Sequence, residues 1–375
     1  VSLAVDPTDN SIWAGSFGGG LVNIANKNIR IFKQHNSSLQ NATVLGNTNN
    51  CNVSGLAFDQ NKHLWISNYG AIKNLSVRKK DGSFQSFTIP FIHTENAVAD
   101  ILVDDANQIW ILSPKGNGIF CFNYNNTIEV LSDDKWRLYQ TGQNRGNLPS
   151  NNVHCFAKDK DGFIWVGTDR GIGIIDCAAN VFTQNCDAIL PIIQRSQFAG
   201  YLFQDENVQS IAVDGANRKW VGTKNGVWLI SADGNTIIYR FSRENSPLLS
   251  NDVQKIVIHP TTGEVFFATT KGICSFRSTA TEVASSSSND VLVFPNPIPP
   301  DYNGTIAIRG IINNAWVKIV EPNGRLVFET KALGTQAVWN GRNYKGEKVA
   351  SGVYLVLVKE NNGNEKMVTK LVIVR

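Results

Sequence analysis

Six segments of the chain align without gaps around one aromatic position, and this repetition constrains the fold more than any other sequence feature. The fourth copy, CFAKDKDGFIWVGT from Cys155, and the fifth, SIAVDGANRKWVGT from Ser210, illustrate the shared pattern. The aromatic residues recur every 45 to 55 positions and are Trp13, Trp65, Trp110, Trp165, Trp220 and Phe266. A period of this length is typical of proteins built from one small unit repeated many times.

Each repeat has the same internal order of strands and turns. A short alternating apolar run leads to an Asp or His and a polar turn, then to the strand with the aromatic residue, and then to a Gly-containing turn and a third strand, such as residues 171–175. Alternation broken by turn residues every few positions indicates antiparallel strands in tight hairpins. Fourth strands are predicted at residues 29–32, 84–89, 136–139 and 237–241. A four-stranded sheet at this period predicts an all-β chain whose residues 1–278 form a β-propeller.

The recurrent Trp and the Asp before it have structural explanations in such a fold. One large ring per blade fills the space between neighbouring sheets and buries roughly 150–250 Å². The Asp of the turn caps backbone amides. The turn from Asp159 to Gly162 has only two acidic residues, fewer than a calcium loop needs, so we predict no calcium site there.

The repeats resemble the two-component regulator propeller repeat. The fullest match is Leu148-Pro149-Ser150-Asn151-Asn152-Val153 followed by Asp161-Gly162-Phe163-Ile164-Trp165-Val166-Gly167-Thr168, and the lead-in recurs from Ser246 to Val253. The resemblance implies a propeller, usually of seven blades, so six units starting within a blade indicate that part of the ring lies upstream. It says little about function, because propellers have many roles.

A second domain is expected after the repeats end. Residues 279–290 are small and polar, include four consecutive serines, and read as a flexible linker. Residues 291–375 then show six or seven short strands with Asn-Gly and Lys-Gly turns, which is the pattern of an Ig-like β-sandwich. The predicted strands are at 305–309, 316–320, 326–330, 336–339, 353–359 and 367–374, after an opening run from Val291.

This tail resembles the type A C-terminal sorting domain of the type IX (Por) secretion system of Bacteroidetes. The resemblance rests on Phe294-Pro295-Asn296-Pro297, Asn323-Gly324-Arg325, Trp339-Asn340-Gly341-Arg342-Asn343 and Gly352-Val353-Tyr354, with Lys370 and Arg375 at the end. Asn340 departs from the pattern, where Asp is commoner. The motif residues are Pro295, Asn296, Pro297, Gly324, Trp339, Gly341, Gly346, Gly352 and Tyr354.

The sorting resemblance implies export through the type IX translocon to the outer-membrane surface, or secretion. In most such cargo a sortase cuts before the domain and attaches the protein to anionic lipopolysaccharide, and the Ser-rich linker is where a cut is sterically feasible. One component of the surface attachment complex also consists of regulator-type propellers followed by an uncut sorting domain. The partners of that component are the sortase and an outer-membrane shuttle. The similarity to that component runs through residues 309–312 and 337–344.

The positive charge of the chain is concentrated in the tail. Residues 291–375 contain 11 Lys and Arg against 6 Asp and Glu, whereas the whole chain has a net charge of +4. Two interpretations stay open, a solvated basic face and a surface for an anionic partner. For the second, the candidate contacts with an anionic glycan are Arg309, Lys318, Arg342, Lys345 and Lys348.

The sequence shows no constellation that carries catalysis. The five histidines are scattered, no His-Glu-x-x-His or Gly-x-Ser-x-Gly motif occurs, and no Cys-x-x-Cys pair indicates zinc. Cys121, Cys155 and Cys274 lie in apolar runs and read as packing residues. Cys177 and Cys186 bracket a short connection, and both a disulfide and two free thiols stay open there. We therefore predict a non-enzyme with no cofactor, no metal, no nucleic-acid partner and no transmembrane segment of its own.

Three functions follow from these observations. The first is a non-catalytic part of the attachment machinery that binds anionic lipopolysaccharide and supports the sortase. The second is a type IX-secreted cargo whose propeller binds or cleaves a polysaccharide. The third is the sensor ectodomain of a hybrid two-component system, which is disfavoured because a membrane helix and a kinase are expected after such a propeller.

Overall fold

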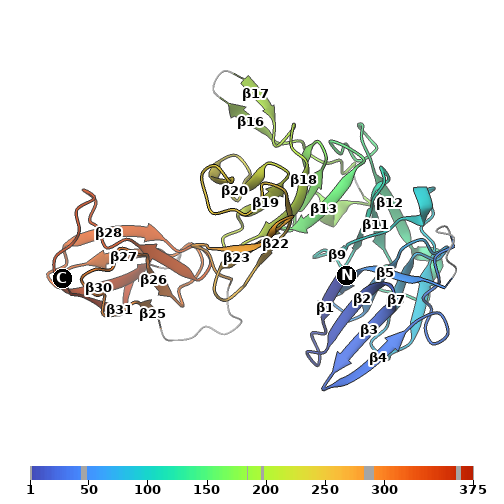
Figure 1. The fold of residues 1–375 in the computed structure, drawn as a ribbon, viewed down its shortest axis with the longest axis horizontal. Helices are drawn as coiled ribbons and strands as arrows, with labels where there is room; N and C mark the ends of the chain where they lie inside the picture. Colours follow the sequence, from blue (N-terminus) through green and yellow to red (C-terminus); the bar gives the residue numbers. More distant parts are fainter. Residues whose placement is uncertain are drawn as a thin grey trace. The chain divides into compact units, whose positions relative to one another are not determined.

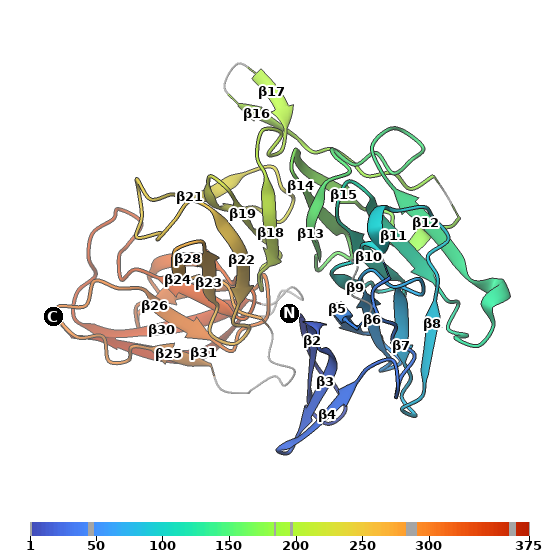
Figure 2. The same cartoon turned by 45° about the vertical axis from the view of Figure 1, so that its right-hand side comes forward.

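The computed structural model describes residues 2–43, 49–183, 185–195, 198–282, 291–359 and 365–374. Its regular elements are β-strands apart from three 3-10 turns, η1 (Thr94–Asn96), η2 (Leu131–Asp133) and η3 (Ala178–Asn180). The chain divides into two compact units, Val1–Ile211 with Val221–Asn225, and Ala212–Trp220 with Gly226–Arg375. The all-β class is confirmed, and Figures 1 and 2 show the ribbon from two directions.

One antiparallel sheet forms at each sequence repeat. The first has β1 (Ser2–Val5), β2 (Ile12–Gly18), β3 (Gly20–Ala25) and β4 (Asn28–Phe32). The second has β5 (Cys51–Phe58), β6 (Leu64–Asn68), β7 (Leu75–Arg78) and β8 (Phe84–Phe87), and a short pairing of β2 with β5 joins these two sheets. The third has β9 (Ile101–Val103), β10 (Ile109–Ser113), β11 (Gly118–Asn123) and β12 (Lys135–Tyr139).

The remaining repeats follow the same plan. The fourth sheet has β13 (Val153–Lys158), β14 (Ile164–Thr168) and β15 (Gly171–Ile175), and a separate hairpin has β16 (Ile192–Arg195) and β17 (Phe198–Tyr201). The fifth has β18 (Val208–Val213), β19 (Lys219–Thr223), β20 (Gly226–Ile230) and β21 (Ile237–Phe241). The sixth has β22 (Val253–Ile258), β23 (Glu264–Thr269) and β24 (Gly272–Arg277).

The four predicted fourth strands are present as β4, β8, β12 and β21, so the strand order read from the repeats is confirmed. The fourth and sixth sheets have three strands among the described residues rather than four. In the fourth repeat the chain turns into η3 after β15 and returns only as an isolated bridge, in which Ile189 and Ile174 exchange backbone hydrogen bonds of 2.7 and 2.9 Å.

The Asp of the repeat binds both the backbone of its turn and the indole of its Trp. Asp159 Oδ1 accepts hydrogen bonds from the amides of Asp161 and Phe163, at 3.0 and 2.9 Å, which confirms the predicted turn cap. Its Oδ2 accepts a bond of 2.9 Å from Nε1 of Trp165, whose ring is 1% exposed. The same indole bond joins Asp59 to Trp65 and Asp104 to Trp110, at 2.9 and 2.8 Å. The Trp is therefore a core residue held in one orientation.

The first, fifth and sixth repeats depart from this arrangement. In the first, Nε1 of Trp13 has no hydrogen-bond partner among the described residues. In the fifth, Arg218 Nε donates to Asp214 Oδ2 at 2.8 Å, and the buried Nε1 of Trp220 has no hydrogen-bond partner among the described residues. In the sixth, Phe266 occupies the predicted aromatic position but is only partly buried, and its neighbour Phe267 enters the core instead. Phenylalanine has no N–H, so nothing polar orients it at that position.

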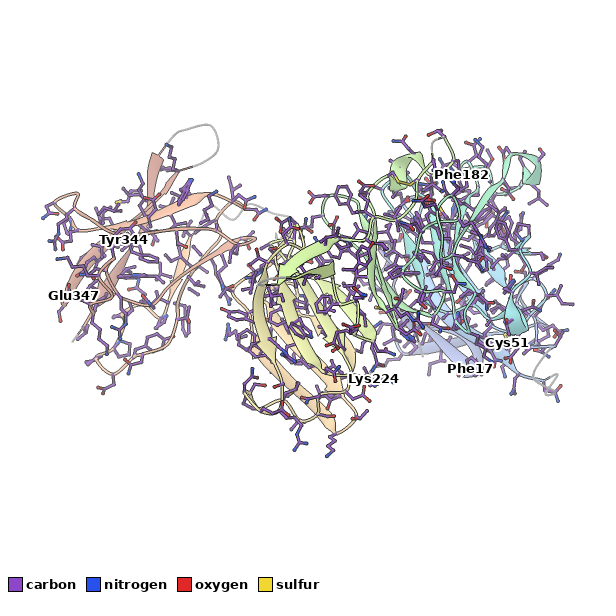
Figure 3. The ribbon with its side chains drawn as sticks, turned by 90° about the horizontal axis from the view of Figure 1, so that it is seen from above. Phe17, Cys51, Phe182, Lys224, Tyr344 and Glu347 are labelled. Atoms are coloured by element: carbon purple, nitrogen blue, oxygen red, sulfur yellow. A yellow bond between two sulfur atoms is a disulfide. The ribbon has the colours of Figure 1, made fainter. Side chains whose placement is uncertain are left out.

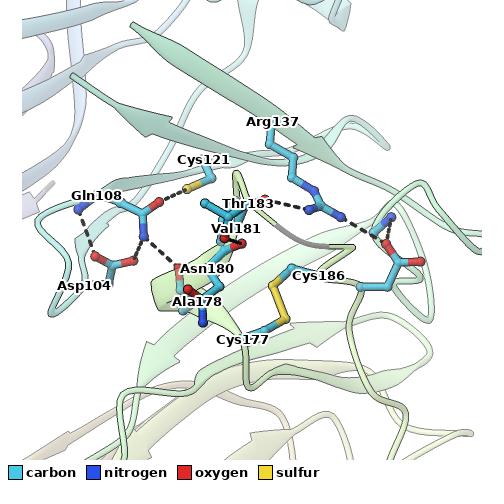
Figure 4. Close-up of a disulfide and its surroundings, with 12 residues drawn as sticks. Asp104, Gln108, Cys121, Arg137, Cys177, Ala178, Asn180, Val181, Thr183 and Cys186 are labelled. Atoms are coloured by element: carbon cyan, nitrogen blue, oxygen red, sulfur yellow. Dashed lines mark hydrogen bonds and ion pairs between the residues drawn. A yellow bond between two sulfur atoms is a disulfide. The ribbon is translucent and has the colours of Figure 1, made fainter. Parts of the chain in front are cut away.

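A disulfide joins Cys177 to Cys186 and encloses η3 (Figure 4). The enclosed loop is also bound to the third sheet. Gln108 Nε2 donates to the carbonyl oxygen of Ala178 at 2.7 Å, and Arg137 donates to a second loop carbonyl at 2.8 Å. The pairing that the sequence left open is thus formed, and it fixes the connection that follows the fourth sheet.

The tail has two antiparallel sheets. One has β25 (Leu292–Phe294), β26 (Ile306–Arg309) and β29 (Gln336–Trp339), and the other has β28 (Leu326–Lys331), β27 (Trp316–Val320), β30 (Gly352–Lys359) and β31 (Glu365–Ile373). Buried residues of both, among them Ile308, Trp339, Ile319 and Val356, form one core. The strands match the predicted segments, and the Ig-like character of this two-sheet domain stays a prediction.

Residues 279–282, assigned from the sequence to the linker, are bonded to the tail within the second unit. Thr281 bridges Gly334, and its Oγ1 lies 2.9 Å from Oγ1 of Thr335. Gln336 Nε2 donates to the carbonyl of Thr279 at 3.2 Å. A Cβ on Gly334 would collide with the carbonyl oxygen of Thr281, so this close approach requires glycine. Residues 283–290 of the predicted linker lie outside the described residues, and the domain boundaries stay predictions.

Candidate functional site

The Phe294-Pro295-Asn296-Pro297 motif lies along β31. Asn296 Nδ2 donates to the carbonyl of Lys370 at 3.1 Å, and Asn296 Oδ1 accepts from the amide of Val372 at 2.9 Å. The side chain thus replaces a partner strand at this point of β31. The motif asparagine therefore has a structural role in the tail.

Trp339 and Tyr354 form the aromatic centre of the tail core. Trp339 is 2% exposed and donates its indole N–H to the carbonyl of Arg342 at 2.7 Å. Tyr354 is 5% exposed, meets Trp339 edge-on at 6.2 Å, and donates its hydroxyl to Ala350 at 2.9 Å. The two bonds tie both ends of the loop between β29 and β30 to the core.

The motif glycines lie at turns. Gly324, Gly341 and Gly346 have φ values of 86°, 70° and 80°, in the left-handed region that favours glycine, and Gly352 begins β30. Of the motif residues, Trp339 and Tyr354 are thus core residues, and Gly324, Gly341 and Gly346 are turn residues.

Three of the five candidate basic residues lie on one exposed loop, residues 340–350, which we call the basic loop. Arg342 and Lys348 pair across it as an isolated bridge, and Lys345 lies at its turn. Arg342 donates to the carbonyl of Gly346 at 2.6 Å, and Lys348 Nζ lies 2.7 Å from Oδ1 of Asn303. Figure 3 shows Tyr344 and Glu347 on the same loop; the first is 62% exposed and the second supplies the one carboxylate.

The other two candidates lie elsewhere on the tail. Lys318 is on β27 in the second sheet, opposite Glu329 of β28. Arg309 is at the end of β26 that pairs with Gln336, whereas the basic loop follows the Trp339 end of β29. The structure therefore brings Arg342, Lys345 and Lys348 together and leaves Arg309 and Lys318 outside that group.

Arg309 instead lines a groove that the sequence did not indicate. The groove has a volume of about 270 Å³ and is lined by Arg277, Ser278, Thr279, Phe294, Tyr302, Thr305, Ala307, Arg309, Gln336 and Val338. Arg277 was missed because it ends β24, on the propeller side of the predicted boundary. No local sequence signal relates it to Arg309.

A larger hollow of about 520 Å³ lies in the first unit, at β15 and the β16–β17 hairpin. Asp169, Asp205, Arg170 and Tyr201 are among its lining residues. Burial acts to raise the pKa of Asp169, but hydrogen bonds from Ser150 and Asn152 outweigh it and leave that pKa lowered. A carboxyl group of this kind stays ionised near neutral pH and is unsuited to donate a proton.

The free thiols are packing residues. Burial raises the pKa of Cys51 to about 11 and raises that of Cys121 well above its usual value, so neither forms a thiolate readily near neutral pH. Within the described residues, no group of three or more His, Cys, Asp or Glu is placed to hold a metal ion. None of the helices that the structure describes has the length and apolar character to cross a membrane.

Two family models match the chain. The two component regulator propeller model matches residues 147–170, and the secretion system C-terminal sorting domain model matches residues 292–374. Both matches coincide with the motifs read from the sequence and confirm propeller repeats followed by a sorting tail. No curated protein matches the chain in sequence.

Solved structures share the fold. PorZ, an essential bacterial surface component of the type-IX secretion system of Porphyromonas gingivalis, is 26% identical with a TM-score of 0.69, and the match covers 100% of this chain and 51% of PorZ. The chain thus spans about half the length of PorZ. The extracellular domain of a hybrid two-component system from B. thetaiotaomicron is 14% identical with a TM-score of 0.51, over 99% of this chain and 49% of that one.

An enzyme also has this propeller. Virginiamycin B lyase from Staphylococcus aureus is 15% identical with a TM-score of 0.50, over 73% of this chain and 83% of the lyase. At these identities the lyase and the two-component ectodomain show the fold alone. The chain is a β-propeller protein with a secretion-sorting tail, related in structure to a type IX secretion component.

Proposed function

We propose that the chain is a non-catalytic cell-surface component of the type IX secretion attachment machinery, similar to PorZ. The observation that carries the proposal is that the likeness to PorZ runs through the whole chain, propeller and tail together, and is joined to a sorting-domain match over 292–374. The sorting tail supports export to the outer-membrane surface of a Bacteroidetes-type bacterium, or secretion. Its partners in this role are the translocon, the sortase and the outer-membrane shuttle.

The ligand that we propose is anionic lipopolysaccharide, bound at the basic loop of the tail. The loop is exposed and carries three positive side chains against the single carboxylate of Glu347. Contacts of this kind are electrostatic, and added salt screens them. Arg309 and Lys318, the other two candidates, lie outside the loop and are not required for this binding.

Deletion of residues 291–375 tests the sorting role. The truncated propeller should accumulate in the periplasm, because the address is lost while the blade cores remain. Proteolysis of whole cells, with the full-length chain as the control, measures surface exposure. A truncated chain that still reaches the surface would show that the tail is not the sorting signal.

A charge-neutralised loop tests the ligand. The triple variant R342Q, K345Q and K348Q should bind lipopolysaccharide bearing anionic groups much more weakly, and wild-type binding should fall steeply as salt is added. The matched control is K331Q, K359Q and K366Q, which removes the same charge from exposed positions elsewhere on the tail. Thermal stability should change little in either triple variant, since exposed substitutions usually alter it by about 0.5 kcal/mol or less. Salt-independent binding, or equal loss in both variants, would remove the loop as the site.

The main alternative is a secreted cargo whose propeller binds or cleaves a polysaccharide. The hollow near Asp169 and Asp205 is the place where such a ligand would bind. Incubation of the chain with acidic polysaccharides and assay for new reducing ends would detect cleavage, and a positive result would replace the proposal. The sensor ectodomain, the remaining alternative, is supported only by the fold.

A further inference from the structure

The groove that contains Arg277 and Arg309 has the lining of an anion site. It lies within the second unit, between the end of β24 and the sheet formed by β25, β26 and β29. Its ten lining residues include two arginines and no Asp or Glu. Two guanidinium groups facing one space without a carboxylate repel each other, and a bound anion removes that repulsion.

Arg277 is available to a ligand. It is exposed, and its side chain has no hydrogen bond or ion pair among the described residues. Glu264 lies opposite it in the strand pairing, but Oε1 of Glu264 accepts a hydrogen bond of 2.7 Å from Ser275 instead. The fork of donors on Arg277 is therefore unused within the part of the chain that the structure describes.

Arg309 is held in place behind it. Its Nε donates to Oε1 of Gln336 at 2.8 Å, and Nε2 of Gln336 donates in turn to the carbonyl of Thr279 at 3.2 Å. This relay positions the guanidinium, whose two terminal nitrogens have no partner among the described residues. Burial and the charge of Arg277 lower the pKa of Arg309, which reflects the same lack of a counter-charge.

Two further lining residues, Ser278 and Thr279, are held in place by Arg218. Arg218, which is paired with Asp214, donates to Oγ1 of Thr279 and to Oγ of Ser278, both at 3.1 Å. The segment is thus held by the fifth sheet on one side and by Gln336 on the other. A site built this way needs little reorganisation to bind its ligand.

The remaining lining residues fit a sugar. Phe294 is 72% exposed, and Tyr302 lies nearby with its hydroxyl bonded to the carbonyl of Thr305 at 2.8 Å. An exposed aromatic face beside two cations and several hydroxyl or amide groups suits the apolar face and the polar edge of a pyranose ring. The volume is just below the usual range of about 300–1,000 Å³ for ligand pockets, and so suits a single sugar unit rather than a chain.

We propose that this groove is a binding site for one anionic sugar residue, with its phosphate or carboxylate between Arg277 and Arg309 and its ring against Phe294 and Tyr302. The groove shares no lining residue with the basic loop, although its Tyr302 is next in sequence to Asn303, which bonds Lys348 of that loop. The inference does not depend on the proposed function. It requires both the last blade and the tail, because Arg277 belongs to one and Arg309 to the other.

Titration calorimetry of the full chain with four small probes tests the inference. Glucose 6-phosphate and glucuronate, which present a phosphate and a carboxylate on a pyranose, should bind; inorganic phosphate should bind more weakly, and glucose should not bind measurably. The relative affinity of the first two identifies which anion the groove prefers. Equal binding of glucose and glucose 6-phosphate, or no binding of either anionic sugar, would overturn the proposal. Equal binding of inorganic phosphate and the sugar phosphate would overturn its sugar part.

Variants at Arg277 locate the binding. R277Q should weaken binding about tenfold, as expected for loss of charge-assisted hydrogen bonds, and R277K, which keeps the charge without the fork, should fall between. K271Q removes an equal charge from the turn before β24 and should bind like the wild type. Since the Arg277 side chain has no partner among the described residues, all three variants should keep the wild-type melting temperature. Wild-type affinity in R277Q, or an equal loss in K271Q, would exclude the groove.

Discussion

The indole hydrogen bond of the repeat is open to a direct energetic test, because the chain supplies matched tryptophans with and without it. Nε1 of Trp165 donates to Asp159 at 2.9 Å, whereas Nε1 of Trp220 is unpartnered among the described residues. Both rings are at most 1% exposed. A Trp-to-Phe substitution removes a similar amount of buried ring at either position, so the difference between the two variants reports the hydrogen bond.

The expected difference follows from the charge of the acceptor. A hydrogen bond to a charged group contributes about 1.5–3 kcal/mol net, and its loss also leaves a buried carboxylate oxygen short of a donor. Trp165→Phe should therefore lower the free energy of unfolding by about 1.5–3 kcal/mol more than Trp220→Phe. At Trp220 the substitution removes an unsatisfied N–H, which offsets part of the lost packing.

Urea unfolding followed by far-UV circular dichroism measures the difference, with equal m-values required for the comparison. Trp220 and Trp165 lie in different units, so Trp13→Phe serves as a second control inside the first unit. Trp13 is 3% exposed, and its Nε1 is also unpartnered among the described residues. Equal losses in Trp165→Phe and both controls would refute the reasoning.

Three further predictions concern the rest of the fold. Trp165→Ala or Trp220→Ala should each destabilise by about 3–5 kcal/mol through a core cavity, without selective loss of ligand binding, as calorimetry and binding on the same variants would show. Replacing Cys177 and Cys186 by Ser opens a loop closed over a separation of 9 residues, and should cost about 3 kcal/mol by loop entropy; an unchanged melting temperature would contradict this. Burial and the neighbouring carboxylate of Asp133 raise the pKa of Asp134 to about 6 in the folded protein. The folded state therefore binds the Asp134 proton more tightly than the unfolded state, and the stability that this gives is present below pH 4 and is lost as the pH rises through about 6. Asp134→Asn should therefore stabilise the protein above pH 6, on the order of 1 kcal/mol after solvent screening, and give no gain below pH 4 in melting scans at both values.

The strands and blades could be predicted because their signals are local. Alternation and turn residues define a strand within a few positions, so β4, β12 and β21 appear where the pattern indicated. The sixth repeat shows where this local prediction fails. The alignment places Phe266 at the aromatic position, but Phe267 is the residue buried in the core. The alignment records position along the strand, and burial depends on what packs against each face.

The candidate basic residues show the same difference between local and long-range information. Arg342, Lys345 and Lys348 lie on one loop because they are close in sequence and share one turn. Arg309 and Lys318 share only their charge with these three residues, and the strand pairing places them elsewhere on the tail. Strand pairing decides which residues distant in sequence become neighbours, and the charge of each residue alone does not reveal that pairing.

By itself the sequence determined the all-β class, the repeated blades, the turn caps and the sorting motif, since each depends on residues within one turn or one strand pair. Only the tertiary structure decided which Asp orients an indole and which gives its oxygen to Arg218, and that Cys177 bonds to Cys186. It also decided that Arg277 and Arg309 line one groove. The physical reason is that these contacts depend on how separate segments pack against one another. That packing produces no repeating pattern in the amino-acid sequence.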